Sequence, residues 1–428
     1  MVDPRIQANK MLGRYVCLIF SVLILYAPDL QSRTLSKEQA VGLAMEHNPV
    51  VQAANKEWAI YRALKSQAWA PPEPEFELEY EELAELTATG DYGDRKVGFN
   101  QLVEFPLEWW YRGRSWSKKA ESVQYSRFEM ARLETSTLVK VAFDRVLFSQ
   151  QVLEYSELNL ELARDFYSKS REKFEAGEVA ELEVLRASVE ESRAENRVTA
   201  TRSELAVSKA ALSSLLAEGW DSSFDLTGEF SHTSLNIDFD RLKTLALEYR
   251  PDLRGARLNT VASKMNRSMA VYSAVPGVNL GVSRQTISNT TGNEKFWRLR
   301  LGVNLPLWAP LRQKGRISQA TAERDQAFAL QEGVHYTVLL EVEEAYSNLQ
   351  SAEKQVETFE NRILPESERA SEMSLISYGE GKSSYLEVLE AQRVLTQVRV
   401  EYAESVFNSL NALATLERAV GIELTNIQ

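Results

Sequence analysis

Two stretches of the chain alternate apolar and polar residues. In PEFELEYEE, which starts at Pro74, the apolar residues Phe76, Leu78 and Tyr80 alternate with the glutamates Glu75, Glu77 and Glu79. In KVGFNQLVEF, which starts at Lys96, the residues Val97, Phe99, Val103 and Phe105 share one face, with Gln101 as the exception. A period of two places successive side chains on opposite faces of a strand. The pattern therefore predicts a hairpin of two strands at about 74–106.

The same pattern returns about two hundred residues later. Val278, Leu280 and Val282 alternate with small or polar residues, and the run from Trp297 to Leu305 alternates in the same way. Arg298 and Arg300 lie on the polar side of this run. The sequence predicts a second hairpin at about 276–306, and a proline, Pro106 or Pro306, ends each hairpin.

Strands of about ten residues with one apolar face are typical of membrane β-barrels. A soluble sheet with one face on a core gives the same alternation, so the pattern alone leaves both interpretations open. Four strands are too few for closure, since a barrel with every backbone group paired needs about eight or more. If these strands lie in a membrane, several chains must share one barrel, and three chains of four strands would give twelve.

Most of the remaining chain is predicted to be helical. Residues 112–173 contain no proline and would form about 90 Å of helix at 1.5 Å per residue. Residues 315–377 form a similar stretch, in which Pro365 predicts a kink or break. Residues 182–217 and 386–419 are predicted to return in the opposite direction. An ordinary helical bundle would explain these helices equally well, but it would not explain the strands.

The chain repeats itself. Gly177 and Gly381 lie within two similar segments, FEAGEVAELEVL and YGEGKSSYLEVL. The second glycine comes 204 residues after the first, since 381 − 177 = 204. Other landmarks recur with nearly the same shift, which predicts two structural repeats at 35–218 and 240–423, joined by a linker at 219–239. The two glycines are predicted to form the turns between long helices. Ser384 and Glu387 match the Ser-x-x-Glu capping box of a helix start.

The N-terminus predicts the compartment. Three basic residues, Arg5, Lys10 and Arg14, precede a short apolar run, which is typical of a signal peptide at about 1–32. The alternative is a buried N-terminal helix. Cys17, the one cysteine of the chain, lies inside this segment and would be removed with it. The net charge of −12 argues against a nucleic-acid partner, which would need a basic face.

No enzymatic site emerges from the sequence. The segment GEGKSS is similar to a phosphate-binding loop, but Ile376 stands where that motif needs glycine. The three histidines, His47, His232 and His335, do not have the spacing of metal ligands. We therefore expect no catalytic residues, no metal site and no cofactor.

Four segments together resemble the TolC-type outer-membrane efflux family over nearly all of the mature chain. They are LSKEQAVGLAMEHNPVVQAA from Leu35, YRPDLRGARLN from Tyr249, LPLWAPLRQKGRISQA from Leu305 and YGEGKSSYLEVLEAQRVL from Tyr378. The resemblance is strongest to the branch that serves heavy-metal pumps of the resistance-nodulation-division class. It implies a mainly α-helical homotrimer with four strands per chain in a shared twelve-stranded outer-membrane barrel, surrounded by lipid, and a long periplasmic α-helical barrel.

The resemblance also implies a role for particular residues of an export duct that works with a periplasmic adaptor and an inner-membrane pump. The residues expected to dock the adaptor are Gly177, Glu178, Val179, Gly381, Lys382 and Ser383. Glu387 and Glu390 are candidates for an acidic gate ring, although acidic residues are also common in first helical turns. The charges expected in the barrel lumen are Glu75, Glu77, Glu79, Arg298 and Arg300.

Two alternatives to an efflux duct remain open at the level of sequence. One is the outer-membrane component of a type I protein secretion system, because the pump selects the cargo. The other is a periplasmic coiled-coil scaffold without a channel, which would have no need of four alternating strands.

Overall fold

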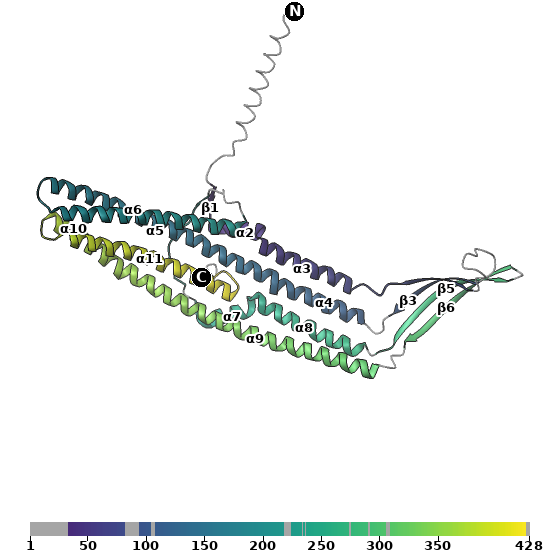
Figure 1. Cartoon of the computed structure of the whole chain (residues 1–428). Helices are drawn as coiled ribbons and strands as arrows, with labels where there is room; N and C mark the ends of the chain where they lie inside the picture. Colours follow the sequence, from purple (N-terminus) through teal and green to yellow (C-terminus); the bar gives the residue numbers. More distant parts are fainter. Residues whose placement is uncertain are drawn as a thin grey trace, which may run out of the picture.

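The computed structural model describes residues 33–81, 94–103, 108–217, 224–232, 234–235, 237–273, 275–289, 292–304 and 309–424. The predicted signal peptide at 1–32 lies outside these ranges. The chain forms a long, narrow molecule with strands at one end and the two turns between long helices at the other (Figure 1).

Helices make up most of the described chain, and two π-helical turns each connect one α-helix to the next. The α-helices are α2 (Lys37–His47), α3 (Pro49–Ala68), α4 (Glu108–Val123), α5 (Met130–Glu175), α6 (Glu181–Leu216), α7 (Phe239–Tyr249), α8 (Pro251–Tyr272), α9 (Ala309–Thr358), α10 (Leu364–Gly379) and α11 (Tyr385–Val420). The π turns are η1 (Gln124–Glu129) and η2 (Phe359–Ile363). Within the described ranges, no helix combines the length and apolar content needed to cross a membrane.

Both predicted hairpins are confirmed and join into one antiparallel sheet. The strands are β2 (Glu75–Glu81), β3 (Asp94–Val103), β5 (Gly277–Asn289) and β6 (Gly292–Asn304), in the order β2-β3-β5-β6. One row of the register runs Glu77, Gly98, Ser283, Arg298 across the four strands. The strands of the first half therefore lie beside those of the second half, although they are far apart in the sequence.

The helices repeat this four-column order. Next to the sheet, the packing order is α3-α4-α8-α9, and toward the turns it is α6-α5-α11-α10. Two columns are continuous, because α4 leads through η1 into α5 and α9 leads through η2 into α10 (Figure 1). The outer columns are therefore β2, α3 and α6 on one flank, and β6, α9 and α10 on the other.

The two π turns lie in different local surroundings. At Pro365 the sequence predicts a kink or break, but the helix passes through η2 and resumes as α10. A proline cannot donate the usual backbone hydrogen bond, and a wider turn before it accommodates the loss. The turn η1 was not predicted. It packs closely against Gly255 of α8, where a Cβ would come within 2.7 Å of the Cβ of Ser126.

Two apolar cores lie near the middle of the molecule, one in each half. The first joins α2, α5 and α6, with Ala40, Ala44, Val139, Phe143, Leu212 and Leu216 among its buried residues. The second joins α7, α8, α9 and α11, with Leu242, Ala246, Leu253, Val338, Val342 and Leu416 among its buried residues. Beside the first core, β1 (Arg33–Leu35) pairs in parallel with β4 (Phe224–Leu226).

A polar residue joins the short helices to the returning helix in each half. The Asn48 side chain caps α3 by accepting a hydrogen bond from Val50 N at 2.9 Å, and it donates to the Leu215 carbonyl of α6 at 2.9 Å. Arg250 stands at the corresponding place before α8. Its guanidinium donates to the Ala419 carbonyl of α11 at 3.0 Å and forms ion pairs with Asp252 at 2.9 Å and Glu341 at 2.6 Å.

Arg250 should be essential for the stability of the second half. Its side chain is 2% exposed, so truncation would leave Glu341 without its closest ion-pair partner and leave a cavity. We expect Arg250→Ala to destabilise the protein by about 3–5 kcal/mol, which is typical of breaking a buried ion pair. The measurement is thermal unfolding of the purified protein, followed by circular dichroism.

Arg362→Ala is the matched control for this experiment, because Arg362 is an exposed helical arginine whose contact with Glu366 is 4.0 Å long. Exposed pairs of this kind contribute about 0–1 kcal/mol. If both variants unfold at the temperature of the wild type, the structural role of Arg250 is wrong.

Candidate functional site

One face of the sheet is apolar and exposed. The row Phe76, Phe99, Val282, Leu299 crosses all four strands, and Leu299 is 77% exposed. The apolar side of β6 extends from Trp297 to Val303, seven residues that span about 20 Å at 3.3–3.4 Å per residue step. Arg284 of β5 lies in the same row as Trp297, and the row beyond it, Arg95, Thr286 and Lys295, is polar. An exposed apolar band with a polar border and an aromatic residue at that border is the surface that a lipid bilayer covers.

The opposite face is polar and has an acidic edge. Glu75, Glu77 and Glu79 project from β2 on this face, as the alternation predicted. Lys96 of β3 lies between two of them, with its Nζ 3.3 Å from the Glu77 carboxylate and hydrogen-bonded to Glu79. The Asn100 amide donates to Glu77 at 3.0 Å. Sequence reasoning missed Lys96 and Asn100, although both lie on the polar face of KVGFNQLVEF.

The other edge of the same face is basic. Arg298 and Arg300 project from β6, and Arg298 donates to Gln285 of β5 at 2.6 Å. All five predicted lumen residues thus share one face of the sheet. The structure does not bring the arginines to the glutamates within one chain, because three strand spacings separate β6 from β2, which is about 14 Å.

The turns at the far end of the molecule have the same geometry in both halves. Gly177 has φ +78° and Gly381 has φ +70°, values that favour glycine. The next amide in each turn closes a six-residue loop: Glu178 N donates to Lys173 O at 2.9 Å, and Lys382 N donates to Ser377 O at 2.8 Å. These are Schellman turns. The predicted turn role of both glycines is confirmed.

All six residues proposed to dock an adaptor lie in these turns, and Gly177, Glu178, Gly381 and Lys382 are exposed. Lys382 is paired with Glu380 at 2.6 Å. Val179 and Ser383 are half-buried.

The predicted capping box at Ser384 is wrong. Ser384 is the N-cap of α11, but its side chain accepts no hydrogen bond from the helix backbone. Its hydroxyl instead points to the Glu387 carboxylate at 3.4 Å. A complete capping box is present at another place, between Ser36 and Gln39 at the start of α2. The motif located the helix start correctly and its hydrogen bonds incorrectly.

The two candidate gate residues are exposed on α11, three residues apart. Glu390 lines a groove of about 610 Å³ between the two long helical hairpins, together with Arg197 and Arg393. Glu390 therefore lies among cations as well as carboxylates.

An ion pair that sequence reasoning missed connects these hairpins. Arg393 of α11 approaches Glu190 of α6, with its Nε 3.3 Å from the carboxylate. Nearby, the Thr396 hydroxyl donates to the Asn159 side chain at 3.2 Å. These two contacts hold the hairpin of the first half to that of the second half. The residues come from different halves of the sequence, and only the packing of α5 on α11 reveals that they meet.

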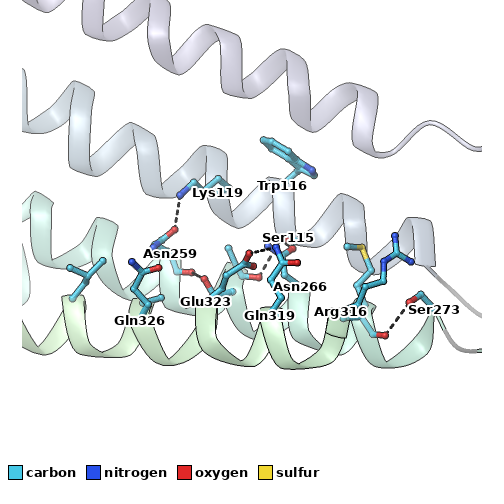
Figure 2. A pocket seen from close by; sticks show the side chains of 17 residues that line it. Ser115, Trp116, Lys119, Asn259, Asn266, Ser273, Arg316, Gln319, Glu323 and Gln326 are labelled. Carbon is cyan, nitrogen blue, oxygen red and sulfur yellow. Dashed lines mark hydrogen bonds between the residues drawn. The ribbon is translucent and has the colours of Figure 1, made fainter. Parts of the chain in front are cut away.

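A second groove, of about 530 Å³, lies between α4, α8 and α9 (Figure 2). Lys119 donates to the Asn259 side chain at 2.7 Å, and Ser115 hydrogen-bonds to Asn266. Burial lowers the pKa of Lys119. Glu323 is the one carboxylate among the lining residues, so the groove has no pair of carboxylates for acid–base catalysis. Across the described residues, no cluster of three or more His, Cys, Asp or Glu could hold a metal ion.

Comparisons with known proteins agree with this architecture. The family described as outer membrane efflux protein matches residues 242–422. The cobalt-zinc-cadmium resistance protein CzcC of Cupriavidus metallidurans is 23% identical over 407 residues, which cover 90% of each chain. Nodulation protein T of Rhizobium leguminosarum is 22% identical over 79% of this chain and 73% of its own.

A solved structure gives the same fold. The outer membrane protein VceC of Vibrio cholerae superposes with a TM-score of 0.74 at 18% identity, over 91% of this chain and 96% of its own.

The exposed apolar sheet and the long helices that lead away from it define an outer-membrane protein with a large periplasmic part. Residues 242–422 belong to the outer membrane efflux protein family.

Replacing Gly381 should destabilise the turn that connects α10 and α11. Gly381→Ala forces an alanine into a positive φ, which costs about 1–2 kcal/mol. We expect hydrogen exchange of the Lys382 amide to accelerate by about five-fold or more, because 1.4 kcal/mol corresponds to a factor of ten.

Gly379→Ala is the matched control, since Gly379 lies within α10 and has open space around it. Alanine is a better helix former than glycine, so the control should slow exchange or leave it unchanged. Equal acceleration in both variants would contradict the assigned turn geometry.

Proposed function

We propose that this protein is the outer-membrane exit duct of a three-part efflux system, which passes substrates through the periplasm and the outer membrane without an energy source of its own. One observation carries the proposal. The four-stranded sheet exposes an apolar band on one face and charges on the other, and its strands lead directly into helices that extend to exposed turns. A duct needs these three parts: a lipid-facing wall, a polar lining and a long passage.

We further propose that the working unit is a homotrimer. Four strands leave two open edges, which hydrocarbon does not tolerate. Three copies would supply twelve strands, enough to close a barrel that leaves an aqueous lumen. The helices of three copies would form the periplasmic tube below it. In this assembly Glu75, Glu77, Glu79, Arg298 and Arg300 line the lumen.

The two halves are proposed to be structural repeats at 35–218 and 240–423, joined through 219–239. The matching order of short helices, hairpin and long helices supports this division. The equivalent positions of Asn48 and Arg250 before α3 and α8 support it as well.

We propose that the two exposed turns dock a periplasmic adaptor, which connects the duct to an inner-membrane pump of the resistance-nodulation-division class. The turns contain Gly177, Glu178, Val179, Gly381, Lys382 and Ser383 and lie at the end opposite the sheet (Figure 1). Glu387 and Glu390 are proposed to contribute to a charged constriction near this end. A duct of this kind does no covalent chemistry, and the matching family is described as outer membrane efflux protein.

Native mass provides the first test. We expect protein extracted with detergent from isolated outer membranes to have three times the mass of the processed chain. The reason is that single sheets cannot remain open in lipid. A monomer, or protein recovered without detergent, would contradict the duct and favour a periplasmic scaffold.

The cargo is proposed to be divalent metal cations, an inference supported by the likeness to CzcC along most of the chain. Deletion of the gene should lower the tolerated concentrations of cobalt, zinc and cadmium at least four-fold, and the wild-type gene should restore them. Drug tolerance measured in parallel is the control. Loss of drug tolerance alone would favour drug efflux, and loss of a secreted protein would favour type I secretion.

A further inference from the structure

The sheet has two unpaired edges with opposite charge. In the described part of the chain, β2 pairs only with β3, and β6 pairs only with β5. On the polar face, the β2 edge carries three carboxylates and the neighbouring Lys96, a net charge of −2, because −3 + 1 = −2. The β6 edge carries Arg298 and Arg300 on the same face, together with Glu294 near the start of the strand, a net charge of +1, because +2 − 1 = +1.

The β6 arginines cannot reach the β2 carboxylates within one chain. The arginines are separated from the carboxylates by about 14 Å of sheet, whereas side chains on adjacent strands have Cβ atoms about 4.5–5.5 Å apart. Between them on this face lie Gly98, Gly281 and Ser283, together with the larger side chains of Lys96, Asn100 and Gln285. Glu75 and Arg300, at the two outer edges, are both exposed.

Strand direction also matches. The sheet is antiparallel throughout, so β6 runs opposite to β2. If β2 of a second copy were placed beside β6, the antiparallel order would continue and the same faces would remain polar and apolar. A contact between two different edges of the same chain is heterologous and can close into a ring.

The helices at the far end present the same two flanks. Below β2, α6 forms the outer column and exposes the apolar side chains of Leu182, Leu185 and Val189. Below β6, α10 forms the opposite outer column and exposes Met373 and Ile376. Each group follows helical spacing of three or four residues, which is the pattern of a packing stripe. Each flank therefore matches the other flank at two places. At the sheet the match is between opposite charges, and at the far helices it is between two apolar stripes.

We propose that copies of this chain join through an acid–base seam, in which Arg298 and Arg300 on β6 of one copy face Glu75 and Glu77 on β2 of the next. The seam rests on the proposed function and specifies how its barrel closes. Because identical edges would place like charges opposite each other, the seam allows only β6-to-β2 contact. Around a ring of three copies, three such seams would line the lumen.

Charge reversal tests the seam. Arg300→Glu and Glu75→Arg each place like charges across it, and each variant should reduce the trimeric fraction in detergent by at least about ten-fold, since three seams are affected at once. The double variant Arg300→Glu/Glu75→Arg restores opposite charges and should recover most of the trimer. Lys295→Glu on the other face of β6 is the matched control and should assemble like the wild type.

Cross-linking tests the contact in a nearly unaltered protein. Cysteines introduced in pairs, at Arg298 or Arg300 and at Glu75, Glu77 or Glu79, should form a disulfide between copies for at least one pair. The shear of the barrel determines which residues of β6 and β2 lie directly opposite each other. A disulfide forms only where the two Cα atoms are within about 7 Å.

The outcomes separate the seam from the proposed function. A wild-type monomer would overturn both. A wild-type trimer that tolerates both single reversals and forms none of the disulfides would overturn the seam alone and leave the duct intact.

Discussion

Hydrogen bonding of the backbone in hydrocarbon is the constraint on which this structure depends. A strand that faces lipid needs a partner on each side, because no water is available for its free N–H and C=O groups. Each chain supplies four strands and leaves two edges open. The four-column order of the sheet is carried through the helices, so the same two flanks are exposed from one end of the molecule to the other. In the proposed trimer, contacts between copies would run along the whole length of the chain.

Short-range patterns in the sequence predicted the elements well. Alternation located β2, β3, β5 and β6, because a face toward lipid and a face toward water impose a strict period of two. Gly177 and Gly381 located the turns, because a positive φ selects glycine. Each of these signals depends only on residues close in sequence.

Contacts between distant residues were beyond the same reasoning. In the sequence, nothing connects Lys96 to the glutamates of the neighbouring strand. The register of β2 and β3 places it between Glu77 and Glu79. The ion pair of Arg393 with Glu190 depends on how two hairpins pack. At Ser384 the sequence motif of a capping box is present. Its hydroxyl, however, donates to the Glu387 carboxylate and accepts no hydrogen bond from the helix backbone. Asn48 and Arg250 perform one task with different chemistry, so the sequence matches the two positions only through the proline that follows each of them.

The π turns have a consequence for the direction in which side chains point. Each residue of an α-helix advances the side-chain direction by about 100°, and a π turn contains about one residue more than an α turn. Side chains beyond η1 and η2 are therefore rotated relative to those before them. The column of α4 and α5 has different neighbours on its two sides of η1, α3 and α8 before it and α6 and α11 after it. The extra residue of the π turn thus rotates the side chains that follow it. One continuous helix can therefore direct its packing face to one pair of helices before the turn and to another pair after it.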